Sequence, residues 1–269
     1  MPRVILAMLD HPTAAAGLMD AARRVAELSG GGRIHVLVAR VPPASTIMAT
    51  EEVLTRDKEA RLRAAESERA TALKAIFESW TASYGTADWL DSEAVAHDLI
   101  VEWGRRADVI VMERPGQHRH ASTTGPALPA ALFETDRPVL VVPVHPAAGF
   151  GQHIAIAWRD DPHATRAVLS ALRFVGKAES VHLLCGVRPG APEPRIPAIL
   201  VEHGIAAELQ TIPLGKDPFG LALLARAHAI GADMLVMGAY AHSPWRQLVL
   251  GGTTRSIFAH ADIPVLMRH

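Results

Sequence analysis

Residues 3–14 read RVILAMLDHPTA, and residues 153–164 read HIAIAWRDDPHA. At an offset of 150 positions (153 minus 3), five consecutive apolar residues match, and so do the later acidic residue and the later proline. A short apolar run before an acidic residue and a proline is typical of a buried strand that leads into a helix. The chain therefore repeats itself, and this repeat decides the fold.

The ends of the two halves match as well. ADVIVME (107–113) aligns with ADMLVMG (232–238) at an offset of 125 positions. FETDRPVLVV (133–142) aligns with FAHADIPVLM (258–267), with one extra residue in the second copy. Because the offset falls from 150 to 125, the first half carries 25 additional residues in its middle.

Apolar runs and helical patterns alternate along each half. The predicted strands lie at 3–8, 33–40, 86–91, 108–112, 138–142, 153–158, 180–187, 206–212, 233–237 and 264–267. The predicted helices lie at 13–28, 51–80, 92–107, 126–135, 162–176, 193–203, 217–230 and 252–260. Runs such as DMLVM and PVLVV are apolar at every position, which indicates burial on both faces of a parallel sheet.

This alternation predicts an α/β protein built from two tandem doubly wound domains, residues 1–145 and 151–269. Each domain is expected to contain a five-stranded parallel sheet flanked by helices, Rossmann-like, with strand order 3-2-1-4-5. The segment VPVHPAAGFGQH (142–153) is rich in proline and glycine and joins the two domains.

The bulk composition excludes several classes of protein. The chain has 269 residues with a formal net charge of −1, so it has no basic field for nucleic acid or an anionic membrane. Its N-terminus lacks signal-peptide features, and no apolar run approaches the length of a membrane span. The single cysteine, Cys185, is expected to be buried and unreactive rather than a reactive thiol. We expect a cytoplasmic protein that binds neither nucleic acid nor membranes.

Glycines and hydroxyls gather where a strand of the second half gives way to a helix. In an open parallel sheet, ligands bind outside the carboxyl ends of the strands. Gly238 ends such a strand, and Gly251-Gly252-Thr253-Thr254 begins the following helix. Glycine permits close approach, and the first amides of a helix favour an anion. The pattern is compatible with a phosphate site and equally with glycines that only turn the chain and a threonine that only caps the helix, so the residues alone leave both interpretations open.

Further side chains are expected at the same edge. Asp160 follows the first strand of the second half, where its carboxylate could accept hydrogen bonds from ribose or from an adenine amino group. Its alternative role is to cap the helix that begins at Pro162. Val187 ends the second strand, and His242 lies in the glycine loop, facing either a phosphate or solvent. Arg255 could add positive charge or face solvent.

The sequence resembles the universal stress protein family, in its tandem two-domain form, over nearly the whole chain. Nucleotide-binding members carry G-x2-G-x9-G-[S/T] between the fourth strand and the last helix, and here Gly238 and Gly251 match the first and third glycines. Asp160 matches the acidic residue near the adenosine, and Thr254 matches a threonine that often follows the third glycine. The resemblance implies a stress-response module whose second domain binds ATP, with Mg²⁺ as a companion ion. The candidate nucleotide-binding residues are Asp160, Val187, Gly238, His242, Gly251, Gly252, Thr253 and Thr254.

The chain also departs from the family pattern. Ala241 stands at the second glycine, and Gly252 stands at the Ser/Thr position. In the first domain Glu113 occupies the position of Gly238, and Thr123-Thr124-Gly125 does not restore the spacing. We therefore expect the first domain not to bind ATP and to act as a structural partner. The resemblance implies that the two domains pack through their final strands as a pseudo-dimer, with a homodimer as the further assembly.

Two other functions stay open. The first is a structural or interaction protein that has lost nucleotide binding. The second is a slow ATPase, which needs a residue to position water, and Asp161 or His242 are the candidates. No catalytic residue is assigned, and no metal site is expected, because the pair His118 and His120 lacks a third nearby ligand. The charged helix at 51–80 is expected to be solvated with one packed face; the alternative is an interaction surface.

Overall fold

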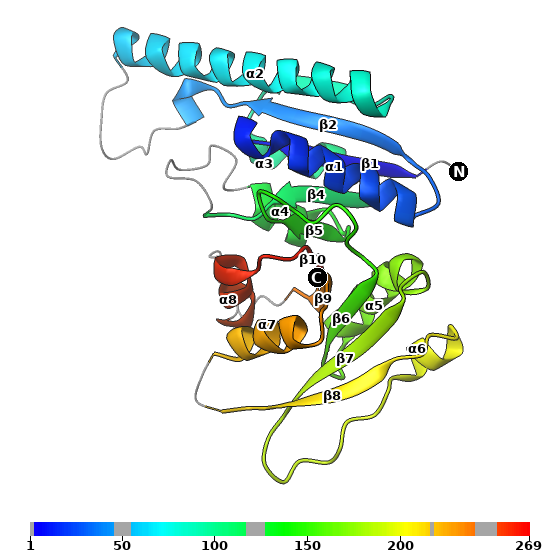
Figure 1. The fold of residues 1–269 in the computed structure, drawn as a ribbon. Helices are drawn as coiled ribbons and strands as arrows, with labels where there is room; N and C mark the ends of the chain where they lie inside the picture. The colour runs from blue at the N-terminus through cyan, green and yellow to red at the C-terminus, as the bar shows by residue number, and fades with distance from the viewer. Residues whose placement is uncertain (1–2, 46–54, 117–126, 216–217, 240–251) are drawn as a thin grey trace.

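The structure is a computed structural model that describes residues 3–45, 55–116, 127–215, 218–239 and 252–269. Within these residues ten strands form one continuous sheet in the order β3-β2-β1-β4-β5-β10-β9-β6-β7-β8 (Figure 1). The first five strands and the last five each follow the order 3-2-1-4-5 when numbered within their own half. The predicted α/β fold is therefore confirmed.

The first half alternates strands and helices as its hydrophobic pattern predicts. Its strands are β1 (Val4–Leu9), β2 (Arg33–Arg40), β3 (Asp88–Glu93), β4 (Val109–Glu113) and β5 (Val139–Val142). Its helices are α1 (Pro12–Leu28), α2 (Arg56–Tyr84), α3 (Ala96–Gly104) and α4 (Ala127–Glu134), with a 3-10 turn, η1, at Pro43–Ser45. All strand pairs described within this half are parallel.

The second half repeats the arrangement. Its strands are β6 (His153–Trp158), β7 (Ser180–Val187), β8 (Glu208–Pro213), β9 (Met234–Gly238) and β10 (Val265–Arg268). Its helices are α5 (Pro162–Val175), α6 (Ala198–Glu202), α7 (Phe219–Ala229) and α8 (Gly252–His260). Its described strand pairs are also parallel.

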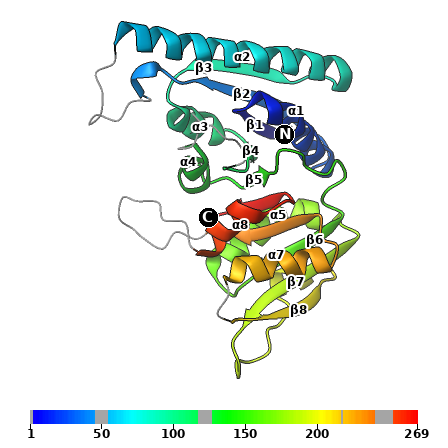
Figure 2. The same cartoon turned by 60° about the vertical axis from the view of Figure 1, so that its left-hand side comes forward.

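The two halves meet edge to edge through their last strands. β10 pairs antiparallel with β5, with Val265 opposite Val141 and Met267 opposite Val139. Figures 1 and 2 show the halves on either side of this pair. The pairing satisfies the backbone groups of two edge strands that would otherwise be exposed, and it makes one sheet of the two halves.

Successive side chains of each buried strand enter opposite faces of the sheet. In β1, Ile5 and Ala7 belong to the core on the face of α1, α2, α5 and α6, while Leu6 and Met8 belong to the core on the face of α3, α4, α7 and α8. Figure 2 shows α3 beside α4 and α7 beside α8. Each of these two cores contains residues from both halves, so the apolar layers run across the junction. No helix in the described ranges is long and apolar enough to cross a membrane.

The halves differ most after their second strand. The helix there has 29 residues in the first half (α2) and 5 in the second (α6). α2 begins at Arg56, where the Thr55 hydroxyl accepts from the amide of Lys58 at 3.3 Å, rather than at the predicted residue 51. The helix predicted at 193–203 is wrong over its first residues, because prolines at 192, 194 and 197 lack the amide hydrogen that a helix interior requires.

Candidate functional site

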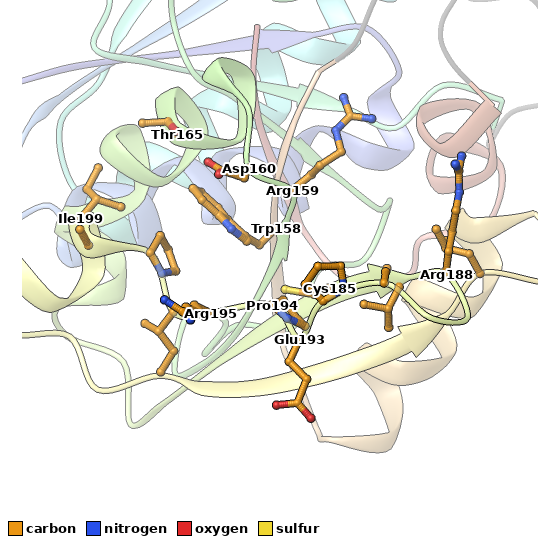
Figure 3. Close-up of a pocket in the computed structure, with 18 residues that line it drawn as sticks. Trp158, Arg159, Asp160, Thr165, Cys185, Arg188, Glu193, Pro194, Arg195 and Ile199 are labelled. Atoms are coloured by element: carbon orange, nitrogen blue, oxygen red, sulfur yellow. The ribbon is translucent and has the colours of Figure 1, made fainter.

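A pocket of about 910 Å³ lies at the carboxyl ends of β6 and β7 (Figure 3). Its wall is built by Trp158 to Asp160 at the end of β6, by Cys185 to Val187 at the end of β7, and by Arg188 and residues 191–197 of the following loop. Thr165 from the first turn of α5, Ala198 and Ile199 from α6 and Leu214 after β8 complete the lining. The pocket lies at the edge where open parallel sheets bind ligands, outside the carboxyl ends of the strands, and next to the switch point between β6 and β9.

Two apolar side chains form much of the inner wall. Trp158 and Cys185 face each other in the parallel register of β6 and β7, and both line the pocket. The Cys185 side chain is buried, and burial raises the pKa of its thiol to about 11. At neutral pH the thiol is therefore protonated, which agrees with the expected unreactive cysteine.

Adjacent carboxylates after β6 have different roles. Asp161, not Asp160, is the N-cap of α5: one of its carboxylate oxygens accepts from the amides of His163 and Ala164 at 2.9 and 3.0 Å. The other oxygen accepts from Nε of Arg159 at 2.5 Å. The capping role considered for Asp160 is therefore wrong by one residue, because Pro162 is the first residue of the helix and its cap directly precedes it.

Asp160 itself is exposed and lines the pocket. Within the described residues it makes no hydrogen bond or ion pair, so its carboxylate is available to a ligand. Val187, the second candidate, also lines the pocket. Two of the predicted residues are thus brought together by the ends of neighbouring strands.

The N-terminus of α8 holds the predicted glycine and threonines. Gly252 is exposed, and a Cβ built on it meets no heavy atom within 4 Å. Thr254 is 1% exposed, and its hydroxyl has no hydrogen-bond partner among the described residues. A buried hydroxyl without a partner costs free energy, so this position favours a group that can bond to it.

α7 holds this end of α8 in place. A Cβ on Gly220 of α7 would lie 2.6 Å from Cβ of Ser256 and 2.8 Å from the carbonyl oxygen of Thr253. Only a glycine at this position allows the two helices to approach so closely. The position of Thr253 therefore depends on a residue more than thirty positions earlier (253 minus 220).

Gly238 ends β9 and is buried at the same edge of the sheet as Asp160, because β9 pairs in parallel with β6. Gly238, Gly252, Thr253 and Thr254 do not themselves line the 910 Å³ pocket. The remaining candidates, His242 and Gly251, lie outside the described residues, and so do Ala241, His118 and His120.

Sequence reasoning missed several pocket residues. Thr165, Arg188, Glu193 and Arg195 all line the pocket, and three of them belong to the loop that comes after β7. In Figure 3, Arg188 and Arg195 lie at opposite sides of the pocket. The signal was present, because the rule that ligands bind at strand ends applies to β7 as well as to β6 and β9. Applied to the end of β7, this rule indicates the loop VRPGAPEPR (187–195) as part of the site.

The first half has different chemistry at the corresponding strand end. Glu113 ends β4, where Gly238 ends β9 in the second half. Its neighbour Arg114 donates from Nη1 to the carbonyl oxygen of Phe258 in α8 at 2.7 Å, and burial lowers the pKa of this guanidinium. This strand end therefore carries a carboxylate, and the next residue binds the other half. Among the described residues no group of three His, Cys, Asp or Glu side chains could hold a metal ion.

Comparison with known proteins gives a family match for part of the chain. Residues 202–269, from the end of α6 to the end of the chain, match the universal stress protein family. No curated protein matches the sequence.

Solved structures match the whole chain. A universal stress protein from Archaeoglobus fulgidus DSM 4304 aligns with a TM-score of 0.71 and 16% identity, over 98% of this chain and 97% of that one. A protein of unknown function from Pseudomonas aeruginosa PAO1 aligns with a TM-score of 0.58 and 13% identity, over 99% and 92% of the two chains. A putative universal stress protein from Pseudomonas aeruginosa UCBPP-PA14 has a TM-score of 0.58 and 14% identity, over 99% and 93%. Residues 202–269 thus match the universal stress protein family, and the chain shares the fold of these solved structures over nearly its whole length.

Proposed function

We propose that the second half binds an adenine nucleotide, with ATP and its accompanying Mg²⁺ as the ligand. The protein would act as a stress-response regulatory module in the cytoplasm, with a homodimer as its further assembly. The observation that carries the proposal is the pocket at the ends of β6 and β7, beside which Asp160 has no partner among the described residues. Its volume of about 910 Å³ falls in the range of roughly 300–1,000 Å³ typical of small-ligand pockets.

The adenosine would occupy this pocket. Trp158 and Ile199 offer apolar contact to a base, while the carboxylate of Asp160 can accept hydrogen bonds from ribose hydroxyls. Figure 3 shows Asp160 and Trp158 side by side at the end of β6. The pocket thus combines apolar wall residues with charged and polar groups at its edge, and a combination of apolar and polar lining is usual for small-ligand pockets.

The phosphates would extend toward α8. The first amides of this helix lack intrahelical partners, and the helix dipole favours negative charge there. The buried hydroxyl of Thr254, unpartnered among the described residues, is a second and independent polar group at the same end. Arg188, exposed on the pocket wall, supplies a positive charge within the same half.

Catalysis is not part of the proposal. Hydrolysis would require a group that positions the attacking water. Asp161, one of the two candidates, is engaged as the N-cap of α5, and His242 lies outside the described residues. Binding alone is therefore the function that the described site supports best.

The neighbouring carboxylates after β6 give a matched test. Asp160→Ala removes a ligand-facing acceptor but no contact among the described residues, so ATP affinity should fall about tenfold, the equivalent of about 1.4 kcal/mol, with unchanged stability. Asp161→Ala removes the N-cap and should cost about 1 kcal/mol of stability with a smaller effect on affinity. Isothermal titration calorimetry and urea unfolding would measure the two quantities.

Two results would contradict the proposal. One is the absence of any heat of binding at millimolar ATP with wild-type protein. The other is an Asp160→Ala variant that binds ATP as tightly as the wild type. The first result would favour the alternative of an interaction protein that has lost nucleotide binding.

A further inference from the structure

Arg69 of α2 reaches the carboxyl ends of β1 and β2. These strand ends of the first half correspond to the strand ends that line the candidate pocket in the second half. The register of the strands defines the correspondence: Met8 pairs with Leu37 in the first half as Trp158 pairs with Cys185 in the second. Two residues further along each strand, Asp10 therefore corresponds to Asp160. By the same count, two residues after Leu37 and Cys185, Ala39 corresponds to Val187.

The guanidinium of Arg69 binds both of these first-half positions. Its Nη1 donates to the backbone carbonyl of Asp10 at 2.9 Å and lies 3.7 Å from the Asp10 carboxylate. Its Nη2 donates to the backbone carbonyl of Ala39. One planar cation thus joins the ends of β1 and β2, at the positions where Asp160 and Val187 line the open pocket of the second half.

Glu66, one turn earlier on α2, completes the arrangement. Its carboxylate accepts from Nε of Arg69 at 3.3 Å and from Nη2 at 2.9 Å, a two-point contact. It also accepts from the backbone amide of Val41 at 3.2 Å. The Arg69, Glu66 and Asp10 side chains are 13%, 15% and 8% exposed, so the contacts are shielded from water.

The second half has no equivalent of this arrangement in its described residues. Its helix after the second strand, α6, is only 5 residues long, whereas α2 has 29. The residue that corresponds to Val41 is Pro189, which has no amide hydrogen to donate. The two halves thus use the same strand ends in different ways.

We propose that Arg69 is an internal guanidinium ligand that fills the first half's counterpart of the candidate pocket, fastens α2 to the sheet and closes this half to external ligands. Two backbone carbonyls and the Glu66 carboxylate accept its hydrogen bonds, and the Asp10 carboxylate lies 3.7 Å away as an ion-pair partner, which is the recognition chemistry of a guanidinium cation. The inference concerns the first half only. Failure of ATP to bind the second half would leave it standing.

The test is removal of Arg69 followed by addition of a free guanidinium. Arg69→Ala removes the guanidinium from the partly buried Glu66 and from the strand ends, so its melting temperature should fall by roughly 5 °C or more. Arg63→Ala is the matched control, because Arg63 lies on the same helix, pairs with Glu59 at 2.9 Å and is 64% exposed. That control should change the melting temperature by less than about 2 °C.

Methylguanidinium chloride at low millimolar concentration should then raise the melting temperature of Arg69→Ala, and calorimetry should show one site. Potassium chloride at equal ionic strength should not raise the melting temperature of Arg69→Ala. Methylguanidinium should not raise the melting temperature of the wild type or of Arg63→Ala. Equal melting temperatures of the two alanine variants, or equal responses of all proteins to methylguanidinium, would overturn the proposal. If Arg69→Ala does not fold, Arg69→Lys should still melt below Arg63→Lys, because an ammonium cannot make the two-point contact with Glu66. Equal melting of these two lysine variants would also refute it.

Discussion

Replacing Gly252 by serine should strengthen ATP binding. Gly252 is the first residue of α8, and it stands where nucleotide-binding family members carry Ser or Thr. A Cβ built there meets no heavy atom within 4 Å, and its φ is not in the left-handed region, so serine fits without strain. The substitution therefore adds a hydroxyl at the phosphate end of the proposed site and removes no contact.

The size of the effect depends on the added hydrogen bond. A hydrogen bond to a charged group contributes about 1.5–3 kcal/mol, and the lower figure corresponds to roughly a tenfold gain in affinity. Gly252→Ala is the control: it shares the gain in helix stability, at most about 0.5–1 kcal/mol, but has no hydroxyl. Titration calorimetry with ATP and urea unfolding of both variants separate the two effects. Equal ATP affinity of the serine and alanine variants would refute the reasoning.

Contacts of Gly220 and His97 lead to two further predictions. Gly220→Ala should lose about 1–3 kcal/mol of stability in urea unfolding and bind ATP more weakly, because its Cβ would lie 2.6 Å from Cβ of Ser256 and push the start of α8 away. Gly149→Ala, whose Cβ meets nothing within 4 Å, is the control; equal losses would contradict the close packing of α7 on α8. Hydrogen bonds to Asp98 and Glu134 raise the pKa of His97 above its usual 6.5. Its stabilisation is therefore complete below pH 6.5 and is lost as pH rises through the raised pKa, so His97→Ala should lower the melting temperature more at pH 6 than at pH 9. The same loss at both pH values would rule out this contribution.

Most of the fold was predictable because its signals are local. β7 spans Ser180–Val187 as its apolar run predicts, and the alternation of strands with helices predicts the doubly wound parallel sheet of each half. The structure of the segment before α6 was not predicted correctly, because its apolar and small residues resemble a helix while its prolines prevent one. That extended segment is a wall of the pocket, so the error concealed part of the site.

The candidate site and its first-half counterpart were predicted less completely, because some of their contacts join residues that are far apart in the sequence. Asp160 was identified, but its role depended on which of two adjacent aspartates caps α5, and sequence patterns place helix boundaries only to within a residue or two. The contacts of Arg69 join positions 59 and 30 residues away in the sequence. No local sequence pattern predicts these contacts, because they form only when α2 has packed on the sheet.

The differences between the halves give a physical reason why the proposed nucleotide site would be present in the second half and not in the first. Both halves place an aspartate and a carbonyl at the ends of their first two strands, so the backbone alone does not choose between them. The segment after the second strand makes the choice: a long helix brings Arg69 back to the strand ends in the first half, whereas a proline-rich loop leaves the second open. Glu113 in place of Gly238 adds a negative charge where phosphates would approach in the first half. Removing Arg69 would therefore free the adenosine end of this half but not its phosphate end. Nucleotide binding there would require changes at both positions.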